Sequence, residues 1–367
     1  MFAVLCSFVH GAEPFRFFVG TYTAPNGSRG IYTGHFDAEQ GTLSELTLAA
    51  EYNNPAFLTI HPSKPYLLAI SEAQNGMLMT FRYDKATSQL TLLDDKAVPG
   101  QAPCHLAFHP SENGTSGVVV IANYSSGSIV SFPLMEDGKI GGIVSNIAHT
   151  GSGPNESRQK EPHAHGVYFD NKTMVAVPDL GIDQVVYYNI NLATAELTSF
   201  ADANLRLAPG AGPRHLTFSK DNRFVYVVNE LDSTVSAFDR QTTDPTKPIQ
   251  TVSTLTVGKD AAALKNTTAE IELHPGGKFL YASNRGDDSI AVFTVNDEGK
   301  LALQQNAPSG GKTPRFFCLD PTGRFLLACN QDTGNIAVLT VAQATGTLTL
   351  TDQSVNVSRP ICLSFVR

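Results

Sequence analysis

Short alternating runs of apolar residues recur along this chain of 367 residues, each followed by the same kind of turn. A unit starts with an alternating apolar strand, continues through a turn such as HPGGK or DPTGR, and then has an apolar run that ends near Asn. A third strand follows, as in DSIAVFTV, and a GxL pattern often announces a fourth, as in GKLALQQN. Alternation with a period of two, joined by tight turns, is typical of antiparallel strands. Each unit is therefore predicted to form one four-stranded antiparallel sheet.

The spacing of these units predicts a ring of seven sheets. The third residue of successive units is Phe57, His105, His165, His215, Glu270, Phe316 and Cys362. The intervals of 46 to 60 residues match the length of one β-propeller blade. The last unit, RPICLSFVR, contains a single strand, and its missing strands are found in FRFFVGTYTAPNGSRGIYTGHFD and GTLSELTLAA, near the start of the chain. We expect an all-β, seven-bladed propeller with four antiparallel strands per blade, closed by N- and C-terminal strands that share one blade.

Residues 15–367 are expected to form this single propeller domain, without an internal linker. The preceding residues 1–14 hold a short apolar run but no basic start, so we expect a short signal-like or disordered segment there. Phe15 to Val19 are expected to belong already to a strand. No apolar run approaches the length that spans a bilayer. The chain contains no Trp, which argues against blades of the WD type.

Composition excludes several classes of function. Charged residues make up 16% of the chain and the net charge is −8, without a basic run, so no nucleic-acid surface is expected. The five cysteines are scattered without a CxxC pair, and they predict neither a disulfide framework nor a zinc site. The pieces GSGP and PGAGP lack the strand and helix context of a phosphate loop. We expect no cofactor, no bound metal and no membrane association.

The ring geometry brings two columns of the repeat together at one mouth of the central channel. The first strand of each blade lines the channel and the second runs antiparallel beside it, so the start of the first and the end of the second lie on the same face. The first-strand column, with the residue before it, includes His105, His165, His215, Arg214 and Arg315. The second-strand column reads Tyr22, Glu72, Tyr124, Asp179, Glu230, Arg285 and Gln331. Polar and charged groups around one concave rim predict the functional site.

Several strings in these columns resemble the lactonase family of propellers, namely ESRQKEPHAHG, AGPRHLTFS, VYVVNELDSTVSAF, PGGKFLYASNRGDDSIAVF and DPTGRFLLACNQDTGNIAV. This family contains seven-bladed bacterial 6-phosphogluconolactonases and related fungal carboxy-cis,cis-muconate cyclases. The resemblance extends from FVGTYT at residue 18 to the carboxyl end. It implies a catalytic set of His165, with His163 beside it, Arg214, Glu230 and Arg285. It also implies a cytoplasmic protein, or an exported, periplasmic one if residues 1–14 act as a signal.

These residue types suit the opening of a lactone, in which water attacks an acyl carbon and negative charge grows on the carbonyl oxygen. An arginine can stabilise that oxygen, an imidazole can accept a proton from the water, and a carboxylate can orient either group. Guanidinium groups also bind carboxylates and phosphates, so the rim arginines can hold an anionic substrate instead. We expect the substrate to contact His163, His215, Arg158, Asp179 and Arg315. A structural alternative is that Arg214 and Glu230 form an ion pair between neighbouring strands.

The sequence thus predicts a carboxylic-ester hydrolase that opens a small anionic sugar lactone. The leading candidate is 6-phosphogluconolactone, which places the protein in glucose and pentose phosphate metabolism. Two alternatives stay open. One is a cycloisomerase that closes or opens a muconolactone at the same site. The other is a non-catalytic propeller that binds a ligand or a protein, and such a module should tolerate the loss of His165.

Overall fold

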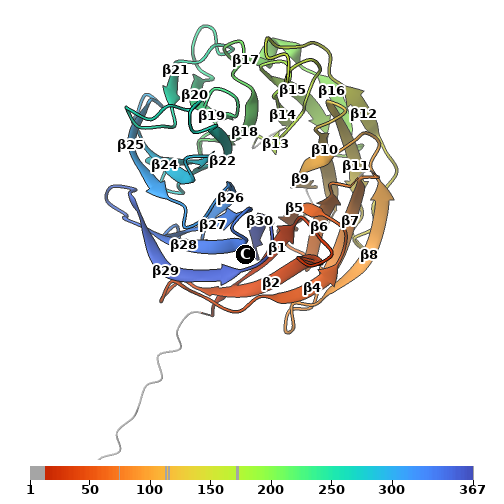
Figure 1. Ribbon diagram of the computed structural model, residues 1–367. Helices are drawn as coiled ribbons and strands as arrows, with labels where there is room; N and C mark the ends of the chain where they lie inside the picture. Colours follow the sequence, from red (N-terminus) through yellow and green to blue (C-terminus); the bar gives the residue numbers. More distant parts are fainter. Residues whose placement is uncertain (1–12, 74, 112–113, 115, 171–172, 367) are drawn as a thin grey trace, which may run out of the picture.

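The alternating segments fold into seven antiparallel sheets that stand as blades around a common axis (Figure 1). This computed structural model describes residues 13–366 apart from 74, 112–113, 115 and 171–172. The predicted all-β, seven-bladed propeller is confirmed. Most of the predicted signal-like start, residues 1–12, lies outside the described residues. Within the described ranges, no helix is long and apolar enough to cross a membrane.

Each blade contains four strand positions, counted from the axis outward. The strands nearest the axis are β5 (Pro55–Ile60), β9 (Pro103–Pro110), β13 (Tyr168–Phe169), β18 (Pro213–Phe218), β22 (Thr267–Leu273), β26 (Pro314–Leu319) and β30 (Pro360–Phe365). The second strands are β6 (Tyr66–Ser71), β10 (Gly117–Asn123), β14 (Met174–Asp179), β19 (Phe224–Asn229), β23 (Phe279–Arg285), β27 (Phe325–Asn330) and β1 (Phe15–Thr21).

The outer half of each blade is more irregular. The third strands are β7 (Met77–Tyr83), β11 (Ser128–Leu134), β15 (Gln184–Asn191), β20 (Thr234–Asp239), β24 (Ser289–Val295), β28 (Asn335–Val341) and β2 (Gly30–Asp37). The outermost strands are β8 (Leu90–Ala97), β12 (Ser145–Ala148), β16 (Glu196–Ser199), β21 (Gln250–Ser253), β25 (Leu301–Pro308), β29 (Leu348–Asn356), and β3 (Thr42–Leu43) with β4 (Thr47–Glu51). The third blade adds a 3-10 helix, η1 (Ala201–Ala203), and a short strand, β17 (Leu205–Arg206).

Burial explains why the second strands are unbroken apolar runs. Every residue of β6 and of β10 is buried, because these strands lie between the faces of neighbouring blades. The outermost strands mix buried, half-buried and exposed residues, as β25 does, since one side of them meets solvent. The inner half of each blade therefore carries the core, and the outer half carries the polar surface.

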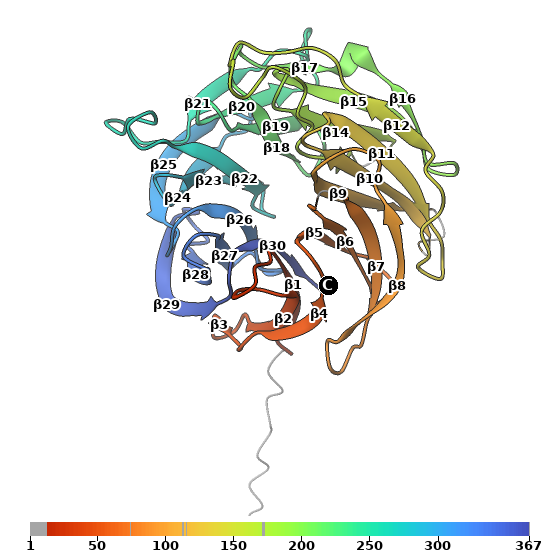
Figure 2. The same cartoon turned by 45° about the vertical axis from the view of Figure 1, so that its right-hand side comes forward.

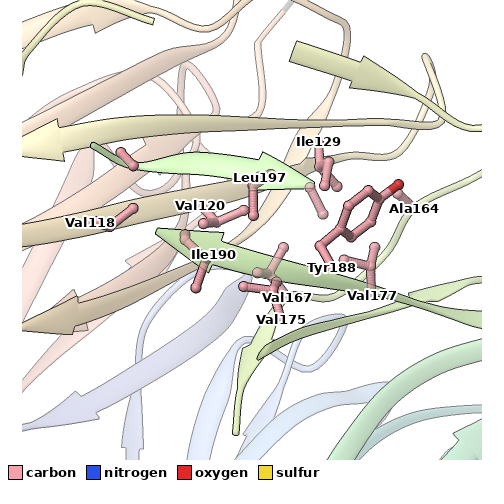
Figure 3. Packing of buried hydrophobic residues seen from close by; sticks show 12 residues of the cluster. Val118, Val120, Ile129, Ala164, Val167, Val175, Val177, Tyr188, Ile190 and Leu197 are labelled. Atoms are coloured by element: carbon pink, nitrogen blue, oxygen red, sulfur yellow. The ribbon is translucent and has the colours of Figure 1, made fainter. Parts of the chain in front are cut away.

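Apolar clusters join each blade to the next. In one of them Val118 and Val120 of β10 pack with Val175 and Val177 of β14 and with Tyr188 of β15 (Figure 3). Seven such clusters are found among the described residues, one at each junction between adjacent blades. Because a blade cannot bury its two faces alone, the ring depends on closure for its stability.

The two ends of the chain close the ring in the predicted way. β30 takes the position nearest the axis, and β1 pairs with it antiparallel, with Val19 opposite Leu363 and Phe17 opposite Phe365. The two strands lie side by side in both views of the ribbon (Figures 1 and 2). β1 then pairs with β2, which pairs with β3 and β4. The strand predicted to begin at Phe15 is thus confirmed as the second strand of the shared blade.

The start of the first strand and the end of the second meet at one mouth, as predicted. In five blades, the residue after the second strand donates its backbone N–H to the carbonyl oxygen of the residue before the first strand. The donor and acceptor pairs are Tyr22 and Arg359, Glu72 and Asn54, Tyr124 and Ala102, Glu230 and Gly212, and Gln331 and Thr313. The accepting residue has a φ between 47° and 65° in each pair. This repeated turn sets the height of the rim side chains.

The third blade departs from the repeat at its first strand. Ahead of the two-residue strand β13, Ala164 makes an isolated bridge with Asp179. Gly166 lets the chain pass close to its neighbour, because a Cβ atom there would lie 2.6 Å from the Tyr168 ring and 3.1 Å from the Arg214 carbonyl oxygen. The sequence HAH is therefore held at the rim in an irregular segment rather than in a regular strand.

Ring closure can be tested with Leu363→Ala, which removes an apolar side chain that is 2% exposed at the junction of the last two blades. We expect it to lower the free energy of unfolding by about 2–5 kcal/mol, as measured by urea denaturation. The matched control is Leu350→Ala on β29, where the side chain is 39% exposed and the expected loss is smaller. Equal effects of the two substitutions would contradict the importance of closure.

Candidate active site

A buried carboxylate lies at the centre of the rim, surrounded by three guanidinium groups. Glu230 follows β19 and is 4% exposed. Its Oε1 accepts a hydrogen bond from Arg158 Nη2 at 2.7 Å, and its Oε2 lies 2.9 Å from Arg285 Nη2. Oε2 also lies 3.3 Å from Arg214 Nε, in an ion pair whose N–H is not aligned for a hydrogen bond. The ion pair between Arg214 and Glu230, which the sequence left as an alternative, is thus present within a larger cluster.

The three positive charges decide the protonation of Glu230. Burial by itself raises the pKa of a carboxyl group, but Arg285, Arg214 and Arg158 outweigh burial and lower the pKa of Glu230 to about 2. The carboxylate is therefore ionised at neutral pH and is a poor proton acceptor. Its contacts indicate that it holds the three guanidinium groups in place.

Two of these arginines are also fixed by backbone carbonyl groups of β22. Arg214 Nη1 donates to the Ala269 oxygen at 2.6 Å, and Arg285 Nη2 donates to the Thr268 oxygen at 2.7 Å. Burial, followed by the guanidinium groups of Arg315 and Arg285, lowers the pKa of Arg214 to about 10, so it stays charged at neutral pH. Arg214 Nη2 and Arg285 Nη1 have no partner among the described residues, and both can donate to a ligand.

Tyr124 connects His163 to this cluster. The two rings are stacked, with centres 4.5 Å apart and planes 11° from parallel, and the Tyr124 hydroxyl accepts a hydrogen bond from Arg158 Nη2 at 3.0 Å. His163 Nδ1 lies 2.9 Å from the Tyr124 carbonyl oxygen. Because a carbonyl oxygen can only accept, Nδ1 carries a proton, so that in the neutral tautomer the lone pair is on Nε2. No described residue forms a hydrogen bond with that Nε2.

His165 lies deeper in the mouth and is 5% exposed. Its ring meets those of His215 and Tyr124 edge to face, at 5.3 Å between centres in both cases. Burial, followed by Arg214 and His215, lowers the pKa of His165 well below its ordinary value, so the imidazole is neutral at neutral pH. His165 Nδ1 lies 3.9 Å from Cys104 Sγ, a thiol whose pKa is raised by burial. Its Nε2, like that of His163, has no partner in the described part of the chain.

Two further histidines form the floor beneath His165. The ring of His215 lies 5.1 Å from that of His105, which packs on Phe57 at 4.0 Å. His215 Nδ1 lies 3.1 Å from both carboxyl oxygens of Glu270. Burial raises the pKa of Glu270 to about 8 and lowers the pKa of His215 well below its ordinary value, so this pair is uncharged at neutral pH.

Two residues predicted to contact the substrate have other surroundings in the structure. Both ring nitrogens of His215 have protein neighbours, because Nε2 lies 3.3 Å from Arg214 Nη1. Asp179 is fully buried, and its Oδ1 accepts hydrogen bonds from the backbone N–H groups of His163, at 2.7 Å, and Gly181, at 2.9 Å. Asp179 Oδ2 lies 2.6 Å from His149 Nδ1. These contacts make His215 part of the floor and Asp179 the anchor of the segment that carries His163.

Arg315 and Tyr22 form another part of the rim. The Arg315 guanidinium carbon lies 5.6 Å from the centre of the Tyr22 ring, and the Tyr22 hydroxyl donates to Glu72 Oε2 at 2.5 Å. Arg315 forms no hydrogen bond or ion pair with a described residue. It nevertheless belongs to the same site, since Tyr22, Arg315 and Arg214 line one cavity and Arg315 contributes to the lowered pKa of His165.

The structure brings Arg158, Arg214, Glu230 and Arg285 into one cluster, with both histidines of the HAH sequence beside it. Tyr124 and Glu270 were missed as site residues, although both stand in the two columns of the repeat. Their residue types could have identified them in the sequence, because the apolar core of a blade requires neither a phenol hydroxyl nor a carboxyl group.

The described residues contain no group of three or more His, Cys, Asp or Glu side chains arranged to hold a metal ion. Arginines, a tyrosine hydroxyl and backbone N–H groups engage the rim carboxylates Glu230, Glu72 and Asp179. The chemistry available at this mouth is therefore that of guanidinium and imidazole groups.

Comparisons with known proteins identify the family of this chain. Residues 16–365 match the family described as lactonase, 7-bladed beta-propeller. The chain is 38% identical to a 6-phosphogluconolactonase of Bacillus subtilis, covering 95% of this chain and 97% of that protein. It is 31% identical to a 6-phosphogluconolactonase of Formosa agariphila, covering 83% and 86%. The structure of a periplasmic gluconolactonase of Pseudomonas aeruginosa superposes with a TM-score of 0.88 at 28% identity, covering 97% and 99%.

The central carboxylate can be tested with Glu230→Gln, which leaves three guanidinium groups around a neutral amide. Because the pKa of Glu230 is lowered in the folded protein, its ionised carboxylate stabilises the folded state at pH values above the unfolded pKa of about 4.3. This stabilisation is lost as the pH falls toward the folded pKa of about 2. At pH 7 we expect the free energy of unfolding to drop by about 3–5 kcal/mol, because a buried ion pair loses one partner.

Urea unfolding at pH 7, 5 and 3 measures this difference, which should shrink at the lowest pH. Glu45→Gln is the matched control, since Glu45 is exposed and its loss should be nearly neutral. A difference between native and Glu230→Gln protein that stays constant with pH would contradict the assignment.

Proposed function

Because the chain belongs to the lactonase family of seven-bladed β-propellers, we propose that it hydrolyses a sugar lactone, and that its substrate is 6-phosphogluconolactone. The reaction consumes water and gives the open-chain acid, 6-phosphogluconate. The observation that carries the proposal is the pairing, at one mouth, of two imidazole groups with guanidinium groups whose remaining N–H donors have no partner among the described residues.

The guanidinium groups supply the stabilisation that ester hydrolysis requires. As water attacks the acyl carbon, the carbonyl oxygen becomes an oxyanion, and fixed donors in a site shielded from water stabilise it. Arg214 Nη2 and Arg285 Nη1 are the donors that remain after the contacts with Glu230, Ala269 and Thr268 are counted. We assign the carbonyl oxygen of the lactone to these two groups.

The histidines supply proton transfer. His163 has its tautomer fixed by the Tyr124 carbonyl oxygen, so the lone pair on Nε2 can accept a proton from the attacking water. The imidazolium that results can then give this proton to the ring oxygen as the C–O bond breaks. His165, whose pKa is lowered by burial and then by Arg214, is neutral, and we assign it a hydrogen bond to the reacting ester. The sequence favoured His165 as the base, and the contact with Tyr124 favours His163.

Glu230 acts on the reaction through the arginines. Its carboxylate neutralises part of the charge of Arg158, Arg214 and Arg285, and it keeps their planes fixed before the substrate binds. Donors that do not have to reorganise during the reaction stabilise the transition state more effectively. We therefore treat Glu230 as a positioning residue and not as a nucleophile or base.

A hydrolysis assay of the purified protein tests the proposal. The panel contains 6-phosphoglucono-δ-lactone and glucono-δ-lactone, the second because a structural neighbour is a gluconolactonase. We expect turnover of both, with the larger kcat/KM for the phosphorylated lactone. Closure of a muconate without consumption of water would identify a cycloisomerase, and no turnover of any lactone would favour a binding propeller.

Substitutions at three residues separate the assigned roles. His163→Ala should lower kcat by about 10²–10⁴, with partial rescue by added imidazole, because the base is lost. Arg285→Lys should lower kcat by about 10²–10³, since it keeps a charge beside Glu230 but removes the planar donor pair. His165→Gln should retain more activity than His165→Ala, because an amide can still donate.

Circular dichroism and the thermal unfolding midpoint serve as controls for folding in these variants. Native kcat in His163→Ala would remove that residue from the mechanism. Equal activity of the Gln and Ala variants at His165 would remove the hydrogen bond assigned to that side chain.

A further inference from the structure

We propose that Arg315 and Arg359, which both lie against the ring of Tyr22, form the subsite that binds the phosphate group of the substrate. The inference rests on the proposed lactone hydrolysis and names the residues that distinguish a phosphorylated sugar lactone from an unphosphorylated one. Its ligand class is a phosphate monoester dianion.

The geometry joins the two arginines at one point of the rim. The guanidinium carbon of Arg315 lies 5.6 Å from the centre of the Tyr22 ring, and that of Arg359 lies 5.0 Å from it. Both distances are in the range of cation–π contacts. The Tyr22 backbone N–H also donates to the Arg359 carbonyl oxygen at 3.1 Å, which fixes the two residues relative to each other.

These two cations differ from the other rim arginines in their partners. Arg158, Arg214 and Arg285 all contact the carboxylate of Glu230. The guanidinium groups of Arg315 and Arg359 form no hydrogen bond or ion pair with a described residue. The nearby carboxylate of Glu72 lies beyond ion-pair distance and accepts the hydroxyl of Tyr22. Two positive charges therefore share one ring without an anion between them, and a phosphate dianion complements them.

The fold does not explain an arginine at position 359. This residue occupies the repeated turn before the first strand, with a φ of 50°. The same turn carries Asn54, Ala102, Gly212 and Thr313 in four other blades, all of them short side chains. Residues other than Gly are uncommon in the left-handed region, and the Arg359 side chain belongs to no apolar cluster of the described residues. Binding of an anion would explain why an arginine occupies position 359, whereas the backbone geometry of the turn does not.

The subsite adjoins the donor that we assign to the lactone carbonyl. Tyr22 and Arg315 line the same cavity as Arg214, whose remaining donor we assign to the lactone carbonyl. We therefore place the ester of the substrate at Arg214 and its phosphate at Arg315 and Arg359. Arg359 is exposed, so it can close over the phosphate from the solvent side.

The test compares Arg359→Asn with the native enzyme on two lactones. Asn tolerates a positive φ and already occupies this turn at position 54, so the fold should keep its thermal midpoint or gain from the change. We expect kcat/KM for 6-phosphoglucono-δ-lactone to fall roughly ten- to a hundredfold, the usual size of a hydrogen bond to a charged group. The value for glucono-δ-lactone should stay unchanged, because that substrate has no phosphate.

Lys278→Asn is the matched control, since it removes one positive charge from an exposed turn at the opposite mouth. We expect Lys278→Asn to leave kcat/KM unchanged for both lactones. This control separates the loss of a local contact from a change in the electrostatic field of the whole protein. If Arg359→Asn lowers kcat/KM equally for both lactones, or lowers it for neither, the proposed subsite is wrong.

Binding measurements keep this inference separate from the proposed reaction. Calorimetry with 6-phosphogluconate and with gluconate reports recognition of the phosphate without turnover. If the native protein hydrolyses no lactone but binds 6-phosphogluconate more tightly than gluconate, and Arg359→Asn loses that preference, the reaction is wrong and the subsite stands. If the native protein shows no preference for the phosphorylated acid, the subsite is refuted.

Discussion

Every blade must bury two apolar faces against its neighbours, and the rest of the structure depends on that requirement. It forces the ring to close, and closure brings residues from distant parts of the chain to one mouth. Arg158 precedes the third blade, Glu230 follows a strand of the fourth, and Arg285 ends a strand of the fifth. Glu230 and Arg285 meet at 2.9 Å because each blade delivers the end of its second strand at the same height, and Arg158 reaches Glu230 at 2.7 Å from the loop before the third blade. The precision of the site thus derives from the packing of the blades.

The charges at this mouth fall into two groups with different consequences. Around Glu230, three guanidinium groups are held by a carboxylate that stays ionised because of them, and this keeps hydrogen-bond donors fixed in a site from which water is largely excluded. Around Tyr22, two guanidinium groups form no ion pair with a described residue, and the nearby carboxylate of Glu72 accepts the Tyr22 hydroxyl. The first group suits an oxyanion that exists only during the reaction. The second suits an anion that the substrate brings with it.

The repeat made the fold predictable, while the site was only partly so. Apolar alternation, turn sequences and a constant interval identified seven blades and the strand shared by the two ends, because these features follow from burial alone. The two columns placed Arg214, Glu230 and Arg285 together correctly, since antiparallel pairing fixes where strands start and end. The contacts of Asp179 could not be foreseen, because its carboxylate accepts backbone hydrogen bonds from His163 and Gly181 beside the irregular first strand of the third blade.

Other features lay outside what a repeat can reveal. The tautomer of His163 depends on one carbonyl oxygen of a neighbouring blade, which no spacing in the sequence encodes. Arg359 stands just before the first strand, outside both columns, and its contact with Tyr22 arises only when the two ends of the chain close the ring. The side chains that support the mechanism most specifically are thus those that depend on contacts between blades.

A crystal structure of the protein with bound 6-phosphogluconate tests the central claim most directly. We predict the acid at the mouth that carries Glu230, with its carboxylate against Arg214 and Arg285 and its phosphate against Arg315 and Arg359. The ring offers a competing site, a cavity of about 450 Å³ lined by Phe108, Tyr168 and Phe218. Binding there, or a phosphate that contacts neither Arg315 nor Arg359, would contradict the assignment of the site.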